Sequence, residues 1–108
     1  MAVGIGNSAN GDLNKLIGIG NSATGNLNTA IGQVNTIQGN VNTVIGNTNG
    51  IVGHANFVKG NQNMAAGIAN AVQGNMNAVV GNVNNVNGNK NSIVGGFNRI
   101  QGYGNEIY

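Results

Sequence analysis

Glycine and asparagine recur at fixed positions of a seven-residue repeat that runs through the whole chain. Glycine occupies every seventh position from Gly4 to Gly102, and a small or branched apolar residue such as Val44 stands five residues after each glycine. Asparagine stands three residues after each glycine, at Asn7, Asn14, Asn21, Asn28, Asn35, Asn42, Asn49, Asn56, Asn63, Asn70, Asn77, Asn84, Asn91, Asn98 and Asn105. Self-similarity at a fixed period predicts a stacked repeat architecture.

The repeat predicts short β-strands rather than helices. A seven-residue apolar period is typical of coiled coils, but a glycine in every heptad would cost a helix about 1 kcal/mol each. Side chains alternate between the two faces of a strand. In residues 39–45, alternation places Asn40, Asn42 and Val44 on one face and residues 41, 43 and 45 on the other. We expect Gly39 to form the turn, because glycine tolerates a positive φ angle.

The similarity between neighbouring segments predicts how many heptads make one coil. Residues 4–17 match residues 18–31 at ten of fourteen places, but match residues 25–38 at only five. We therefore predict an all-β, two-sided β-solenoid with seven-residue half-coils and about 14 residues per coil. Residues 1–108 would form one repeat domain, about 36 Å long at roughly 4.8 Å per coil.

Inside such a solenoid, the repeated asparagines would stack into ladders along its axis. An amide is both donor and acceptor, so identical amides in successive coils can bond to one another. These bonds would offset the usual desolvation cost of a buried polar group. His54 stands where another repeat has asparagine, and we expect it to be a hydrogen-bonded substitute in a ladder. Disorder is the alternative for a Gly/Asn-rich chain, but the strict register favours a folded stack.

Composition excludes several classes of function. Only six residues are charged and the net charge is +2, so there is no clustered basic patch for nucleic acid. The chain has no Cys and only one His, one Asp and one Glu, which argues against an enzyme and against a metal or cofactor site. No apolar run approaches the roughly 20 residues of a membrane span. Residues 1–3 lead directly into the first repeat, so we expect no signal peptide in this chain. An extracellular or cell-surface location is nevertheless favoured.

Two families have repeats that resemble this one. Residues 42–46, 77–81 and 91–95 fit the pattern x-x-N-x-V-x-G, which resembles the repeat of the grass ice-recrystallisation-inhibition proteins. That resemblance covers nearly the whole chain and implies a β-roll with inward Asn and Val that binds ice through a flat outward face. Residues 17–23 are similar, more weakly, to the head repeats of trimeric autotransporter adhesins.

One outward face fits the implied ice binding better than the other. The sheet that begins at Gly4 has mostly small central outward residues, so we take it as the candidate ice face. Lys15, Phe57 and Arg99 on the opposite sheet would interrupt a regular lattice. The candidate residues are Ser8, Ser22, Thr36, Ala78 and Ser92.

Apolar residues at outward positions predict self-association. Contiguous exposed apolar surface usually marks an interface, and here it lies at opposite ends of opposite sheets, which favours open head-to-tail contact. The main hypothesis is therefore a non-enzymatic structural protein that forms a homo-oligomer or filament through apolar columns and open solenoid ends. Ice binding is the alternative, and an adhesin or phage-fibre module is a further one. The predicted interface consists of Leu13, Ile17, Leu27, Ile31, Val41, Ile45, Val52, Met64, Met76, Val80 and Val94.

Overall fold

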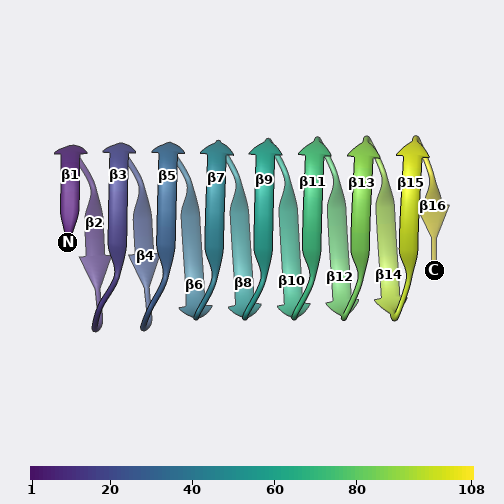
Figure 1. The fold of residues 1–108 in the computed structure, drawn as a ribbon, viewed down its shortest axis with the longest axis horizontal. Helices are drawn as coiled ribbons and strands as arrows, with labels where there is room; N and C mark the ends of the chain where they lie inside the picture. The colour runs from purple at the N-terminus through teal and green to yellow at the C-terminus, as the bar shows by residue number, and fades with distance from the viewer.

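Two parallel β-sheets face each other across a thin core (Figure 1). The computed structural model describes residues 1–108 and contains strands and no helix. The front sheet, nearer the viewer, consists of β1 (Ala2–Ile5), β3 (Lys15–Ile19), β5 (Thr29–Gln33), β7 (Thr43–Asn47), β9 (Phe57–Asn61), β11 (Ala71–Asn75), β13 (Asn85–Asn89) and β15 (Arg99–Tyr103). The back sheet consists of β2 (Ser8–Asn10), β4 (Ser22–Thr24), β6 (Thr36–Asn40), β8 (Gly50–His54), β10 (Met64–Ile68), β12 (Ala78–Asn82), β14 (Ser92–Gly96) and β16 (Glu106–Ile107).

The register between strands confirms a coil of 14 residues. Each strand pairs in parallel with the strand two places further along the chain, so that Val44 lies beside Val58 and Gly46 beside Gly60. The molecule measures 36 × 19 × 12 Å, and its long axis agrees with the predicted length of the stack. The predicted two-sided β-solenoid is therefore confirmed.

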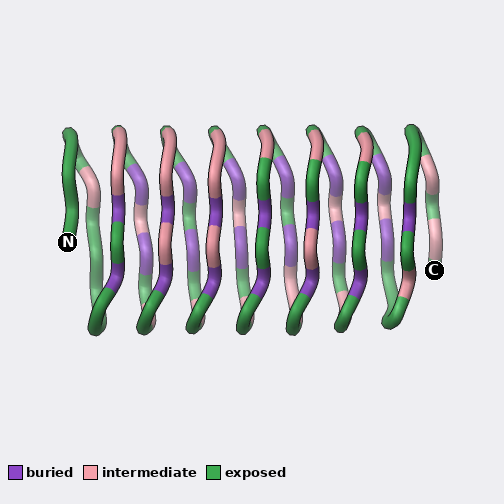
Figure 2. The backbone as a smooth tube through the Cα atoms, viewed as in Figure 1, coloured by how far each residue is buried: buried purple, intermediate pink, exposed green.

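A single file of apolar side chains from each sheet fills the interior. Figure 2 colours the buried positions along both sheets purple. Each inner strand contributes one fully buried apolar residue, which lies between the same residues of the coils before and after it. Small or branched side chains are required, because the two sheets are close and each side chain packs against the buried residues of the adjacent coils. The buried residues are Leu16, Ala23, Ala30, Ile37, Val44, Ile51, Val58, Ala65, Val72, Val79, Val86, Ile93 and Ile100.

The repeated asparagines form the predicted ladders. Asn49 shows the pattern: its Nδ2 donates to Oδ1 of Asn35 at 3.1 Å and to the carbonyl of Gly60 at 2.8 Å. The backbone N–H of Asn63 in the next coil donates to Oδ1 of Asn49 at 2.8 Å. Asparagines 14 to 91 of the repeat are buried, whereas Asn7, Asn98 and Asn105 in the end coils are not. No buried side-chain nitrogen or oxygen lacks a partner, so the ladders satisfy the polar interior.

Most of the repeated glycines lie within strands, and Gly11 and Gly25 directly follow one, so the expectation that the repeated glycines form the turns is wrong. Gly39 is the fourth residue of β6 and has a φ of 129°. A Cβ atom on Gly39 would lie 1.8 Å from the carbonyl oxygen of Gly53 in the next coil. Glycine is therefore required by the close approach of successive coils, as well as by a φ that other residues rarely adopt.

The corners lie two residues after the glycines. Val41 has a φ of 59°, in the left-handed region, and equivalent residues of other coils have the same conformation. Its N–H donates to the carbonyl of Asn26 at 2.9 Å, and Oδ1 of Asn40 accepts the N–H of Asn26 at 3.0 Å. These bonds to the preceding coil hold a conformation that costs a non-glycine residue about 1–2 kcal/mol. Asn40 is exposed rather than inward, and Val41 is a corner residue rather than part of a sheet face.

His54 also differs from its predicted role. It is exposed at the end of β8, in the position that Asn40 has in β6, and its side chain makes no hydrogen bond. Position 54 belongs to the outer side of the corner, so His54 is not a substitute in the buried ladder.

Candidate functional site

Each broad face presents two columns of outward side chains, which run along the stack. On each strand, column 1 is the residue before the buried apolar residue and column 2 is the residue after it. Column 1 of the back sheet contains Ser8, Ser22, Thr36, Gly50, Met64, Ala78, Ser92 and Glu106. Column 2 of the back sheet contains Asn10, Thr24, Gln38, Val52, Ala66, Val80 and Val94.

All five candidate ice-face residues lie in column 1 of the back sheet. Ser8, Ser22 and Thr36 are direct neighbours across β2, β4 and β6, and Ala78 and Ser92 are neighbours across β12 and β14. Parallel strands are about 4.8 Å apart, so these side chains repeat at that spacing. Gly50 and Met64 separate the two groups.

Thr24 belongs to the same surface but was not among the candidates. It follows Ala23 on β4 and is exposed in column 2, beside Ser22 of column 1. Strand alternation alone would have placed it outward, because it lies two residues after Ser22. We use the term hydroxyl patch for Ser8, Ser22, Thr24 and Thr36.

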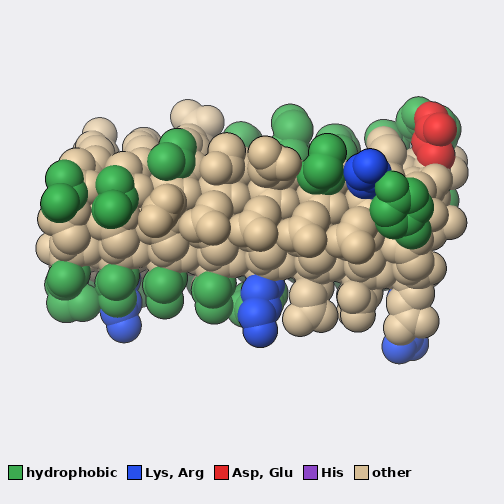
Figure 3. Space-filling view, turned by 90° about the horizontal axis from the view of Figure 1, so that it is seen from above, with side chains coloured by type: hydrophobic (Ala, Val, Ile, Leu, Met, Phe, Trp, Pro, Cys, Tyr) green, Lys and Arg blue, Asp and Glu red, His purple; other side chains and the backbone are tan.

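Charge distinguishes the two broad faces. Lys15 and Arg99 in column 1 and Lys59 in column 2 project from the front sheet. The back sheet has one charged residue in these columns, Glu106 on its last strand. In Figure 3 the front sheet forms the lower outline, where aliphatic side chains are followed along the stack by basic and polar ones. The hydroxyl patch is therefore free of charge.

The aliphatic residues of column 2 lie toward the N-terminal end of the front sheet and toward the C-terminal end of the back sheet. In the front sheet, Ile17, Ile31 and Ile45 are consecutive and precede polar residues. They are half-buried rather than fully exposed as expected, because each lies against its neighbours in the column. In the back sheet the aliphatic stretch instead comes last, with Val80 and Val94 exposed.

Four residues of the predicted interface lie at corners instead of on the faces. Leu13, Leu27 and Val41 have left-handed φ angles and stand where the back sheet leads into the front sheet, and Met76 stands at the opposite corner. All four are exposed. The corner of Leu13 is apolar in every coil, through Leu13, Leu27, Val41, Ala55, Ala69, Val83 and Phe97.

Side-chain contacts at the C-terminal end involve the two tyrosines. The hydroxyl of Tyr108 donates a hydrogen bond to the Glu106 carboxylate, and this bond together with the nearby negative charge raises the pKa of Tyr108. The ammonium of Lys90 lies 5.5 Å from the centroid of the Tyr103 ring, within cation–π range.

No group of three or more His, Asp or Glu side chains is close enough to hold a metal ion. No helix has the length and apolarity needed to cross a membrane.

Comparison with known families agrees with this geometry. No curated protein matches the chain. The family model described as the grass antifreeze beta roll matches residues 4–102, which is nearly the whole solenoid. The resemblance to trimeric autotransporter adhesins has no such support. The inward Asn and Val, the 14-residue coil and the family match lead to one conclusion: the chain belongs to the grass antifreeze β-roll family.

Proposed function

We propose that the protein binds ice and inhibits ice recrystallisation through the outer face of the back sheet. The observation that carries this proposal is the hydroxyl patch, where Ser and Thr side chains repeat at the coil spacing on an uncharged surface. An ice surface is a regular array of water molecules, so a ligand for it needs side chains at regular positions on a rigid support. The ladders and backbone bonds between coils supply that rigidity.

The front sheet is less suited to this function. Thr29 and Thr43 are adjacent in its column 1, but Lys15 precedes them and Phe57 follows. A strongly hydrated ammonium group disfavours contact with an ordered ice lattice. The regular threonine array of the front sheet is therefore only two coils long, because Lys15 and Phe57 bound it on either side.

A matched pair of substitutions tests which face binds ice. Thr36→Tyr and Thr29→Tyr place the same bulky ring in column 1 of the back and front sheets, respectively. We expect Thr36→Tyr to raise the concentration needed for half-maximal inhibition of recrystallisation about tenfold, equivalent to ~1.4 kcal/mol of binding free energy. Thr29→Tyr should leave that concentration and the thermal hysteresis unchanged.

Three results would contradict the proposal. A wild-type protein without activity at millimolar concentration would remove ice binding altogether. Equal losses in both variants would exclude a single binding face, and a loss confined to Thr29→Tyr would place binding on the front sheet.

Self-association is a second candidate function, favoured by the aliphatic stretches of column 2. Ile31 and Ile45 on one face and Val80 and Val94 on the other are apolar surfaces without a partner in the monomer. Burial of such surface contributes roughly 25 cal/mol per Å². Size-exclusion chromatography with light scattering tests it, and a monomer at high concentration would contradict it.

A further inference from the structure

We infer that copies of this chain stack broad face to broad face, with the front sheet of one copy on the back sheet of the next and Phe57 seated in a hollow at Gly50. The inference rests on the self-association candidate and specifies its geometry. It does not depend on ice binding.

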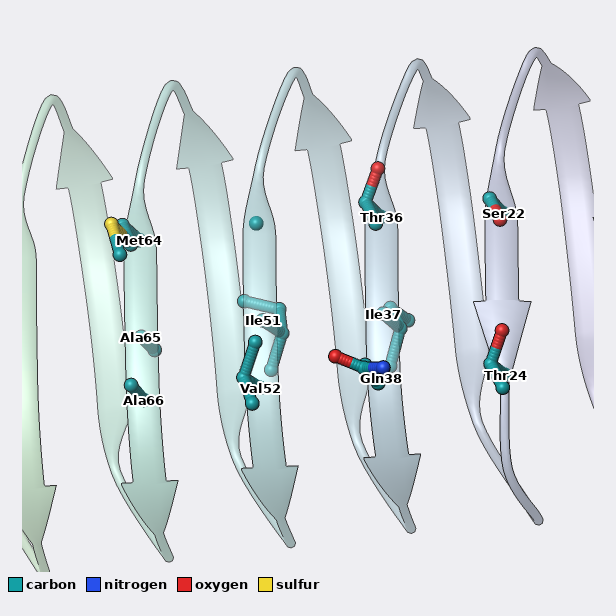
Figure 4. Close-up of a pocket in the computed structure, with 11 residues that line it drawn as sticks. Ser22, Thr24, Thr36, Ile37, Gln38, Ile51, Val52, Met64, Ala65 and Ala66 are labelled. Atoms are coloured by element: carbon teal, nitrogen blue, oxygen red, sulfur yellow. The ribbon is translucent and has the colours of Figure 1, made fainter.

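The hollow exists because Gly50 has no side chain in the middle of column 1. Its φ is not positive, and a Cβ atom there would meet nothing within 4 Å, so neither backbone strain nor crowding requires glycine. The hollow has a volume of about 330 Å³ and lies between Thr36 and Met64 (Figure 4). Glycine weakens a strand, and in a strand it often marks the close approach of a partner.

Phe57 is the matching projection on the opposite face. It lies in column 1 of the front sheet on β9, and 44% of its surface is exposed. Its neighbours in that column, Thr43 and Ala71, are smaller, so its ring stands above them.

Symmetry brings Phe57 of one copy onto Gly50 of another. A half-turn about the normal to the sheets reverses both the order and the direction of the strands. Counted from the N-terminal end of the stack, β9 is the fifth strand of the front sheet. Counted from the C-terminal end, β8 is the fifth strand of the back sheet. The half-turn brings these opposite ends together, so β9 of one copy lies over β8 of the next. Within one copy, the strands of the two sheets run in opposite directions (Figure 1). The half-turn reverses the strands of the front sheet, so they run in the same direction as the back-sheet strands that they contact. Column 1 of one copy therefore lies on column 1 of the next.

In column 2, the same superposition places aliphatic residues on aliphatic residues over three strands and polar residues on polar residues over others. Between these groups, the aliphatic stem of Lys59 lies on Val52. Column 2 is aliphatic in the first half of the front sheet and in the last half of the back sheet, and the half-turn exchanges the ends. The resulting aliphatic pairs are Ile45 on Ala66, Ile31 on Val80 and Ile17 on Val94. The polar pairs include Gln73 on Gln38 and Asn87 on Thr24.

Charge and area also fit this arrangement. Lys15 of the turned copy lies over Ser92, one strand away from Glu106, the acidic residue of the back face. The face measures 36 by 19 Å, which offers about 680 Å² per copy and is close to the ~800 Å² per partner of stable interfaces. The two surfaces in contact are different, so each added copy leaves one of each free and the stack does not close.

The stack covers the hydroxyl patch of every copy but one. Assembly and ice binding therefore compete for the back sheet, and dilution favours the ice-binding monomer.

Disulfide cross-linking tests the contact directly. The chain has no cysteine, so Thr36→Cys with Ala71→Cys introduces the only two thiols. The half-turn places β11 of one copy over β6 of the next, so these two column 1 positions face each other while Gly50 and Phe57 stay in place. Within one copy they lie on opposite outer faces of sheets about 10 Å apart, beyond the Cα separation of 4.4–6.8 Å that a disulfide usually spans. Mild oxidation should therefore produce a ladder of covalent multimers. The control pair, Thr36→Cys with Thr43→Cys, moves the second thiol two strands along column 1 and should cross-link at least about tenfold more slowly.

Removal of the projection gives a second, independent measurement. Phe57→Ala should shift the protein to monomer in light scattering, whereas Phe97→Ala, at an exposed corner outside the contact, should not. A wild-type monomer at millimolar concentration would overturn self-association itself. Association that survives Phe57→Ala, or equal cross-linking of the two cysteine pairs, would overturn this geometry alone. Each of these outcomes is separate from the ice assays, which measure the proposed function of the back sheet.

Discussion

Replacement of one buried asparagine tests whether the ladders hold the solenoid together. Asn49→Ala removes two hydrogen bonds that Nδ2 donates, to Asn35 and Gly60, and one that Oδ1 accepts from the N–H of Asn63. Asn49 is 2% exposed, so water cannot replace these bonds without entering the core.

The magnitude follows from these three contacts. Each hydrogen bond contributes about 1 kcal/mol net, and a buried donor or acceptor left without a partner costs about 1–3 kcal/mol. The carbonyl of Gly60 and the N–H of Asn63 both lose this partner, so we expect a loss of about 3–5 kcal/mol in the free energy of unfolding. That loss is a large share of the ~5–15 kcal/mol typical of a folded domain, and would lower Tm by roughly 20 °C at this size.

Asn47→Ala is the matched control, two residues away in the sequence. Asn47 is exposed at the end of β7, and its side chain accepts one hydrogen bond, from the N–H of Gln33 at 3.2 Å. We expect its loss to cost about 1 kcal/mol or less. Urea unfolding followed by circular dichroism measures both variants. If Asn49→Ala destabilises the protein no more than Asn47→Ala does, the buried ladder is not the main polar support of the fold.

Two further predictions concern the glycines and the C-terminal end. Gly53→Ala should prevent folding, because its Cβ would lie 1.9 Å from the carbonyl oxygen of Gly67. Gly50→Ala on the same strand should instead raise the free energy of unfolding by about 0.5–1 kcal/mol. Circular dichroism measures both effects. Equal effects of these two substitutions would refute the argument from the close approach of coils. Glu106→Gln should return the raised pKa of Tyr108 toward its ordinary value. Tyrosinate absorbance in a Tyr103→Phe background measures this pKa. An unchanged pKa would show that the Glu106 carboxylate does not cause the shift.

Much of the architecture could be predicted because it depends on contacts that repeat every 14 residues. The inward Asn and Val, the coil length and the membership of each heptad in one sheet or the other all follow from that period. The position of the corner could not be predicted in the same way. The contact that requires Gly39 joins it to Gly53 in the next coil, and no single heptad contains it.

The sequence did contain a signal for the true corner. Gly6, Gly20 and Gly104 stand outside the seven-residue register, each two residues after a repeated glycine, and all three have left-handed φ angles. They mark the corner position that other coils fill with larger residues. The hollow at Gly50 had a comparable signal, a glycine at an outward strand position, but its depth depends on Thr36 and Met64 in adjacent coils.

The alternation of heptads between the two sheets has a consequence for how such a protein can change in length. An insertion of two heptads adds one coil and lengthens both faces without altering what either presents. An insertion or deletion of one heptad would leave the core repeat intact but transfer every later outward residue to the other face. Ser92 would then share a face with Lys15, and Arg99 with Ser22. Odd-numbered and even-numbered heptads therefore belong to different faces. This favours evolution of the solenoid by duplication of whole 14-residue coils, which keeps each face unchanged.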